Sequence, residues 1–231
     1  MNQTGFFAAS RIVLGKDLRL EWRTMETLST SLVFSLIVIV IYSFAFGFGS
    51  VRELGAGRLL PGMIWTVVAF ASVVGMVRSF QLERKHDTLG AMFLAPIDRG
   101  AIYCGKMLGN LIKLTVVQWA LLPLIAIFFN HDMTGVILPL VLVLFLHGLG
   151  LSELGTLFAA ISTRLGRGEA MLATLLFPAV SPILISAVKC TEAILDGKGL
   201  ASVSNWLAVT GGFDLLYLMV GLLTFEFVLE E

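Results

Sequence analysis

Six long apolar runs, separated by shorter polar or glycine-rich stretches, set the pattern of this chain. Most of these runs approach the roughly 20 apolar residues that an α-helix needs to cross a bilayer. The pattern therefore predicts an all-α membrane protein with six transmembrane helices, folded as a single domain over residues 1–231. The predicted spans are residues 32–48, 63–77, 111–129, 136–160, 171–188 and 212–228.

The composition agrees with a membrane protein and narrows the class of function. Hydrophobic residues make up 57% of the chain and charged residues 14%, whereas a soluble domain is roughly one quarter charged. The formal net charge is zero, so nothing at the level of the whole chain points to nucleic acid as a partner. The sequence contains no P-loop motif and neither hydrolase motif, GxSxG or HExxH. These absences favour a transport subunit over an enzyme.

Basic residues are divided unequally between the two sides of the predicted membrane. Twelve of the 16 Lys and Arg residues fall in the N-terminal segment and in the loops after the second and fourth spans. Loops rich in Lys and Arg remain on the cytoplasmic side, so both termini are expected in the cytoplasm. On this interpretation Cys104 and Cys190 lie in loops on opposite sides of the membrane and form no disulfide.

The segment 1–31 precedes the first span and has an amphipathic pattern of its own. Leu14, Leu18, Trp22 and Met25 follow one another at steps of three or four residues, and charged residues occupy the other faces. This spacing is typical of a helix that lies flat at the membrane surface. The alternative is a solvated leader with incidental apolar residues, and the length of the pattern favours the interfacial helix.

The loop at residues 78–107 is charged and contains a second amphipathic helix. Its apolar residues recur at spacings that gather them on one side, and a proline is expected to end the helix. Such a helix face is suited to a groove on a soluble partner. The predicted partner-binding residues are Leu82, Glu83, Asp87, Leu89, Met92, Phe93 and Pro96.

Small residues gather on one side of the fourth span. They include Gly148, Ser152, Gly155 and Thr156. Small side chains let two helices approach closely. The stripe therefore predicts either packing within the chain, which is slightly favoured, or an interface with a second subunit.

Two prolines fall in the fifth span, within the stretch FPAVSPILI. Pro178 and Pro182 each remove a backbone hydrogen bond from a helix and permit a kink. The fifth span is therefore the best candidate for a bent helix.

Few ionisable residues lie inside the predicted spans, where burying them is costly. His147 and Glu153 lie well inside the fourth span. Because they are about 120° apart around a helix, one shared site is not expected. Each is interpreted as a polar group hydrogen-bonded to a neighbouring helix, with a substrate or haem role as the alternative. For His131, in a short outer loop, a solvated turn is favoured over a haem ligand.

Four stretches of the sequence carry a resemblance to a known family. They are LRLEWRTMETL, LLPGMIW, HDTLGAMFLAPIDRGAIYCGK and GRGEAMLATLLFPAVSPILISA. With the six spans, they resemble ABC-2 type transporter permeases and, more narrowly, the CcmB family of haem exporter proteins over nearly the whole chain. One departure concerns the docking helix, where related loops commonly read GxLE and this chain has Thr88, Leu89 and Gly90. A glycine inside a helix costs about 1 kcal/mol relative to alanine, so a weaker docking helix or a diverged partner is expected.

The resemblance implies a permease subunit of cytochrome c maturation in the bacterial inner membrane. In such a system the partners are a separate ABC ATPase subunit, a haem-handling membrane protein, a periplasmic haem chaperone and the lipid bilayer. It implies no directly bound cofactor, since haem is the transported or handled ligand and ATP acts through the partner. The ATPase cycle would drive haem delivery, haem export or release of haem-loaded chaperone. Two alternatives stay open: an ABC-2 permease for a drug or polysaccharide, and a non-transporting scaffold of a haem lyase complex.

Overall fold

Helices make up all the regular structure of the described part of the chain. The computed structural model describes residues 5–47, 51, 54–85, 97–164 and 168–228. The elements are α1 (Phe6–Thr24), α2 (Glu26–Phe46), α4 (Ala56–Lys85), α6 (Arg99–Phe128), α7 (Ile137–Arg164), α8 (Gly168–Leu195), the 3-10 helix η1 (Leu200–Val203) and α9 (Ser204–Val228). Six helices are long and apolar enough to cross a membrane. The all-α class and the six spans are thus confirmed.

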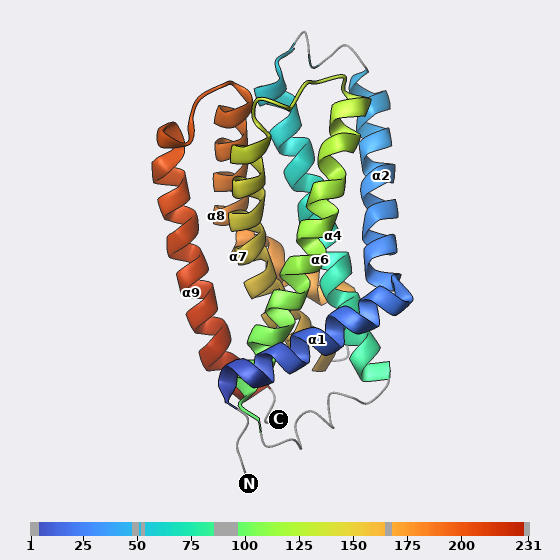
Figure 1. Ribbon diagram of the computed structural model, residues 1–231, viewed down its shortest axis with the longest axis vertical. Helices are drawn as coiled ribbons and strands as arrows, with labels where there is room; N and C mark the ends of the chain where they lie inside the picture. The colour runs from blue at the N-terminus through green and yellow to red at the C-terminus, as the bar shows by residue number, and fades with distance from the viewer. Residues whose placement is uncertain (1–4, 48–50, 52–53, 86–96, 165–167, 229–231) are drawn as a thin grey trace.

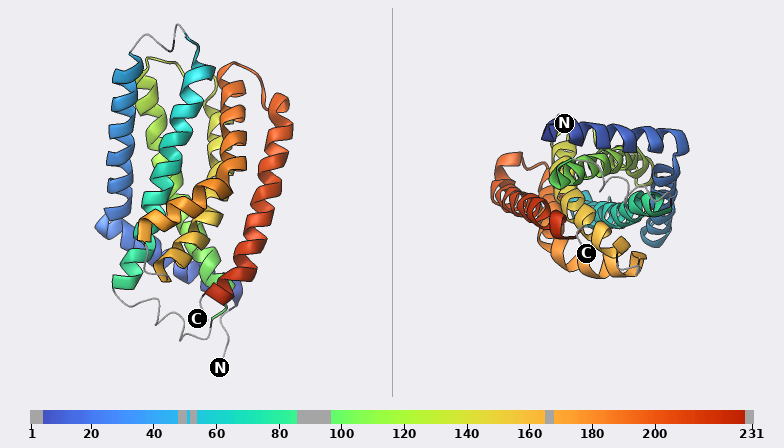
Figure 2. Two further views of the ribbon diagram at one scale, coloured as in Figure 1. Left: turned by 180° about the vertical axis from the view of Figure 1, so that it is seen from behind. Right: turned by 90° about the horizontal axis from the view of Figure 1, so that it is seen from below.

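The six long helices run side by side along the molecule, and α1 lies across one end of the bundle (Figure 1). The C-terminal part of α9 lies at this same end, as an even number of crossings requires. In the end-on view, α1 runs along one side of the bundle, beside α6 (Figure 2). We call this end of the molecule the α1 end.

The helices are longer than the apolar runs that predicted them. Both α4 and α6 have 30 residues, against about 20 for a single crossing. Helical structure therefore extends into both ends of the predicted loop 78–107. For the same reason the placement of the cysteines in loops is wrong: Cys104 lies within α6 and Cys190 lies fully buried within α8.

The helices differ in how much of their surface is buried. In α4, 72% of the apolar stretch is buried, against 28% in α2 and 22% in α9. The peripheral helices point large apolar side chains such as Phe44 and Leu215 outward. A bilayer, where apolar surface needs no further cover, suits such helices. The centre of the bundle is therefore α4, with α2 and α9 on its lipid-facing periphery.

The α8 ribbon changes direction along its length (Figure 2). Both Pro178 and Pro182 lie inside this helix. Proline cannot donate a backbone hydrogen bond, and its ring clashes with the preceding turn, so it commonly bends a helix. The assignment of the bend to these two residues stays a prediction.

Candidate functional site

The predicted docking helix begins as a continuation of α4, which is helical through Lys85. The backbone at Leu82 and Glu83 thus belongs to α4. The side chains of these two residues lie outside the described part of the chain, as do Asp87, Leu89, Met92, Phe93 and Pro96 in full. Their role in partner binding stays a prediction. What the structure does describe is how the chain is held on either side of this segment.

Downstream of the segment, Asp98 fixes the point where helix resumes. Its carboxylate accepts hydrogen bonds from the backbone N–H groups of Gly100, at 2.7 Å, and Ala101, at 3.3 Å. An aspartate in this position caps the start of a helix by pairing N–H groups that have no partner within it. The cap explains why α6 begins at Arg99, well before the apolar run that predicted the third span.

Upstream of the segment, two contacts hold the last turns of α4. The guanidinium of Arg78 forms an ion pair with the carboxylate of Glu26, at the start of α2. Phe80 is buried, and the Nζ atom of Lys106 lies 5.0 Å from the centre of its ring. Such a cation–π contact is stronger where water is excluded. The stretch of α4 that leads into the docking segment is thus tied to both α2 and α6.

Lys106 is the centre of these contacts. It was counted from sequence as a cytoplasmic loop residue, yet it lies within α6 with 0% of its surface exposed. Its ammonium group donates to the carboxylate of Asp17 on α1 at 3.0 Å, and Lys16 lies 3.2 Å from the same carboxylate. Burial alone would raise the pKa of Asp17, but the neighbouring lysines, Lys106 first, hold this pKa below its usual value. Asp17 is therefore ionised at neutral pH, and its carboxylate accepts from the Lys106 side chain.

Two glycines of α6 let α1 approach closely enough for this pair to form. A Cβ atom at Gly105 would lie 2.7 Å from the backbone oxygen of Ser10 and from Val13. Gly109, one turn further on, lies beside Asp17. The Ser10 hydroxyl also donates to the Ala101 carbonyl at 2.9 Å. A GxxxG spacing is a known device for close helix contact, and here it seats α1 on α6.

The junction between α1 and α2 is also fixed. Met25 turns the chain with a φ of 50°, in the left-handed region. The carboxylate of Glu21 accepts a hydrogen bond from the backbone N–H of Leu28 at 2.8 Å. This bond joins the last turn of α1 to the first turn of α2. The left-handed region is uncommon for a non-glycine residue, and the surrounding pairing holds it. As a result α1 is fastened at one end to α2 and along its side to α6.

The face of α1 that packs on the bundle is not its apolar stripe, so the prediction that this stripe lies at the membrane surface is not contradicted. Its buried residues are Ala9, Ser10, Val13, Asp17 and Glu21. The stripe of Leu14, Leu18, Trp22 and Met25 is partly buried or exposed. Sequence reasoning missed Asp17 and Lys106, although the GxxxG spacing of residues 105–109 was a usable signal.

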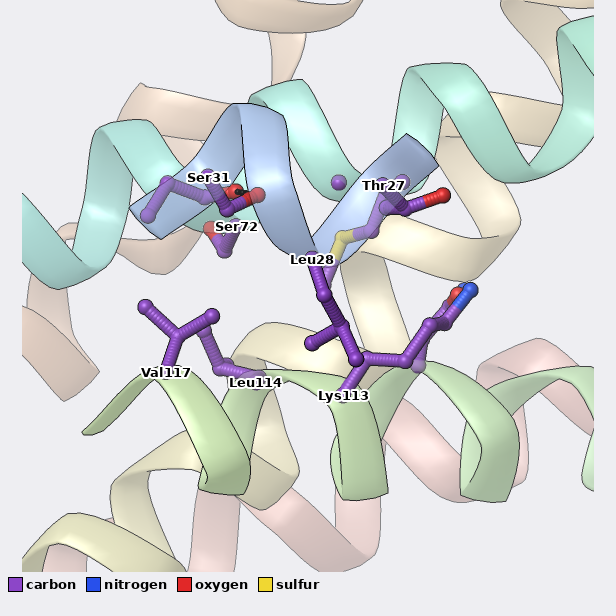
Figure 3. Close-up of a pocket in the computed structure, with 11 residues that line it drawn as sticks. Thr27, Leu28, Ser31, Ser72, Lys113, Leu114 and Val117 are labelled. Atoms are coloured by element: carbon purple, nitrogen blue, oxygen red, sulfur yellow. Dashed lines mark hydrogen bonds between the residues drawn. The ribbon is translucent and has the colours of Figure 1, made fainter. Parts of the chain in front are cut away.

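A small cavity lies beside this junction, between α2, α4 and α6 (Figure 3). It has a volume of about 20 Å³, which is room for about one water molecule. Its lining includes Thr27, Ser31 and Ser72 together with Lys113, Leu114 and Val117. A space of this size cannot hold a haem-sized ligand, so this cavity is a gap in the packing of the three helices rather than a substrate pocket.

His147 forms hydrogen bonds through both ring nitrogens. Its Nδ1 lies 2.8 Å from the Val143 carbonyl, while its Nε2 lies 3.2 Å from the Ser186 hydroxyl and 2.9 Å from that of Thr210. Ser186 belongs to α8 and Thr210 to α9, so the histidine joins three helices. The interpretation of His147 as a polar group bonded to neighbouring helices is confirmed, and neither nitrogen is left over for a metal.

Glu153 and His147 have no hydrogen-bond partner in common among the described residues. The backbone carbonyl of Glu153 accepts a hydrogen bond from the Tyr103 hydroxyl at 3.1 Å. Glu153 and Asp214 are both buried, and each has one carboxyl oxygen without a hydrogen-bond partner among the described residues. No group of three His, Cys, Asp or Glu residues within those ranges is close enough to hold a metal ion.

The stripe of small residues on α7 packs within the chain. Gly148 and Gly155 face Gln118 of α6 and Met76 of α4, and the amide of Asn110 donates to the Thr156 hydroxyl at 2.9 Å. Ser152, like Thr156, has 0% of its surface exposed. This arrangement supports the alternative of packing within the chain over an interface with a second subunit.

Comparisons with known proteins agree with this architecture. Heme exporter protein B of Rhodobacter capsulatus is 32% identical over 187 residues, covering 81% of this chain and 84% of the relative. Heme exporter protein B of Pseudomonas aeruginosa is 27% identical over 198 residues, covering 85% and 86%. The model of the CcmB protein family matches residues 8–230. Because that match spans almost the whole chain, this six-span membrane protein belongs to the CcmB family.

Proposed function

We propose that this chain is the permease subunit of an ABC-type complex for cytochrome c maturation, working in the bacterial inner membrane with both termini in the cytoplasm. ATP would be hydrolysed by a separate ATPase subunit, and the permease would couple that cycle to haem delivery or export, or to release of a haem-loaded chaperone. The relatives named heme exporter protein B support the haem-related role. The distribution of basic residues supports the orientation.

The observation that carries the proposal is the joint at the α1 end. The docking segment continues directly from α4, whose last described side chain, Phe80, contacts Lys106. Lys106 in turn is paired with Asp17, and Arg78 with Glu26. A force on the end of α4 would therefore reach α1, α2 and α6 through these contacts. This is the arrangement that a subunit driven by a soluble partner needs.

The proposal assigns no haem ligation to this chain. Both ring nitrogens of His147 are already hydrogen-bonded within the protein, and haem iron requires a positioned side chain as an axial ligand. Movement of helices, in place of iron coordination, would be the contribution of this subunit. The haem-handling membrane protein and the periplasmic chaperone would hold the haem itself.

The test is whether the docking segment recruits the ATPase. Leu89→Asp and Phe93→Asp place a charge on the predicted apolar face, where truncation of an anchor alone can cost about 2 kcal/mol or more. We expect each variant to insert into the membrane but to lose co-purification of the ATPase and mature cytochrome c. Lys85→Ala is the control, because it changes only the charged face predicted from the sequence, where even the loss of a surface ion pair would cost under about 1 kcal/mol.

Two outcomes would contradict the proposal in different ways. Full ATPase retention with a normal cytochrome c yield in both Asp variants would mean that this segment is not the coupling element. Normal maturation when the catalytic carboxylate of the ATPase is replaced would mean that the complex needs no hydrolysis, as expected for a scaffold.

A further inference from the structure

The outward side of α1 carries a stripe of arginines interrupted by one glycine. Arg11, Gly15, Arg19 and Arg23 follow one another at four-residue steps, which places them along one side of the helix. A Cβ atom at Gly15 would have nothing within 4 Å, so this glycine is not required for close packing. A glycine inside a helix costs about 1 kcal/mol relative to alanine. Its effect here is to leave open space between two arginines.

That space forms a hollow on the protein surface. This hollow is an open space of about 550 Å³ between side chains of α1 alone, lined by Arg11, Ile12, Gly15, Lys16, Arg19, Leu20 and Arg23. Arg11, Arg19 and Arg23 are exposed, and no hydrogen bond or ion pair of their side chains occurs within the described ranges. Lys16, by contrast, forms the ion pair with Asp17. The hollow is thus rimmed by three guanidinium groups that face outward.

The hollow lies at the level where a bilayer ends. Met25 alone separates α1 from α2, which is a predicted membrane span. The contacts of α1 with α6 fall in the first three turns of that helix, from Ala101 to Gly109. With 30 residues, α6 is about 45 Å long, longer than the roughly 30 Å hydrocarbon core, so its first turns extend to the headgroup region.

The face of α1 next to the arginine stripe is apolar and exposed. Phe7 is 87% exposed and Trp22 is 79% exposed, with the partly buried Leu14 and Leu18 between them. Aromatic side chains of this kind favour the membrane–water boundary. α1 therefore has one side buried on the bundle and an outward side on which the arginine stripe and exposed apolar side chains suited to acyl chains lie next to one another.

We propose that the hollow at Gly15 is a binding site for the phosphate headgroup of an anionic phospholipid. The guanidinium group offers paired donors that match phosphate oxygens, so three of them around one hollow suit this ligand. The adjacent Phe7 and Trp22 would contact the acyl chains of the same lipid. This site is independent of the docking segment and of the proposed haem role.

The experiment measures which lipids stay bound to the purified full-length chain. The protein in detergent is incubated with phosphatidylglycerol or phosphatidylcholine, and bound lipids are counted by native mass spectrometry over a concentration series. We expect wild type to bind phosphatidylglycerol in preference to phosphatidylcholine. Arg19→Gln and Arg23→Gln should each lower the affinity for phosphatidylglycerol about fivefold, which is the effect of one basic residue near an anionic surface. Gly15→Leu should lower this affinity as well, because the leucine side chain fills the hollow without changing the charge.

Matched control variants lie at the opposite end of the bundle. Arg58→Gln removes an exposed arginine of α4, and Gly62→Leu adds a side chain where a Cβ would also meet nothing within 4 Å. Both should leave the preference unchanged. All variants should elute as folded protein in size-exclusion chromatography, since each position is exposed or open.

Three results would overturn the proposal. The first is equal retention of the two lipids by wild type. The second is displacement of phosphatidylglycerol by millimolar inorganic phosphate, which would make the site one for a free anion. The third is unchanged lipid retention in the arginine variants together with loss of ATPase co-purification, which would make this face a protein contact.

Discussion

The ion pair between Asp17 and Lys106 gives the sharpest test of how α1 is held. Its two members belong to different helices, 3.0 Å apart, with 8% and 0% of their surfaces exposed. We consider three variants: Asp17→Leu, Lys106→Met and the two combined. Each replaces a charged side chain by an apolar one of similar length, so the changes in volume are small.

The structure predicts unequal effects of the single changes. Removing one member of a buried ion pair costs about 3–5 kcal/mol, and Asp17→Leu should fall in this range because it strands a fully buried ammonium group. Lys106→Met should cost less, about 1–3 kcal/mol by the same rule, since Lys16 remains 3.2 Å from the Asp17 carboxylate. Replacing a whole buried pair by apolar groups is often nearly neutral, so the double variant should fall within about 1 kcal/mol of wild type.

The assay is reversible unfolding of the purified protein in mixed micelles, titrated with a denaturing detergent and followed by circular dichroism. The three free energies of unfolding form a double-mutant cycle with wild type, and a coupling of about 2 kcal/mol or more is expected. Strictly additive effects, or single variants each within about 0.5 kcal/mol of wild type, would refute the view that this pair seats α1 on α6.

Three further predictions follow from the same contacts. The pKa of Asp17 is lowered in the folded state, so its contribution to the free energy of unfolding should be present above pH 3.8 and be lost as the pH falls below that value. Asp17→Asn should lack this pH-dependent contribution in unfolding scans. Gly105→Ala should destabilise the protein by about 1–3 kcal/mol through overpacking, whereas Gly62→Ala, in open space, should be neutral or slightly stabilising in the same assay. In a variant without its native cysteines, an impermeant maleimide applied to spheroplasts should label Lys198→Cys and miss Arg23→Cys, both of which are exposed; labelling of Arg23→Cys from outside would reverse the orientation.

The parts of the fold that sequence predicted well are those governed by the bilayer. Six long apolar runs gave six helices because the hydrocarbon core demands both length and apolar character. The positions of the helix ends were not predicted, because local polar interactions set them. Asp98 begins α6 by capping two N–H groups, and the charged residues at the end of α4 continue its helix to Lys85. Neither signal appears in an average of hydropathy.

The joint at the α1 end was beyond the reach of periodicity for a different reason. Apolar spacing marks the stripe of Leu14 and Trp22 as a membrane-surface side, and it says nothing of the side buried on the bundle, which carries Asp17 and Glu21. Burying a carboxylate is costly without a partner, and the partner of Asp17, Lys106, is 89 residues away in sequence. A pattern that counts Lys106 as a charged loop residue cannot supply this pairing.

A polar joint has a consequence for motion that an apolar one would not have. Apolar helix faces can slide by a turn and still bury their surface, because the hydrophobic effect is not directional. A shift of α1 by one turn along α6 would separate Asp17 from Lys106 and place a side chain where only Gly105 fits. The two helices should therefore move as one body. Phe80 contacts that body at Lys106. Displacement of the end of α4 is therefore expected to tilt α1 and α6 together, and α2 with them through Glu21 and Leu28.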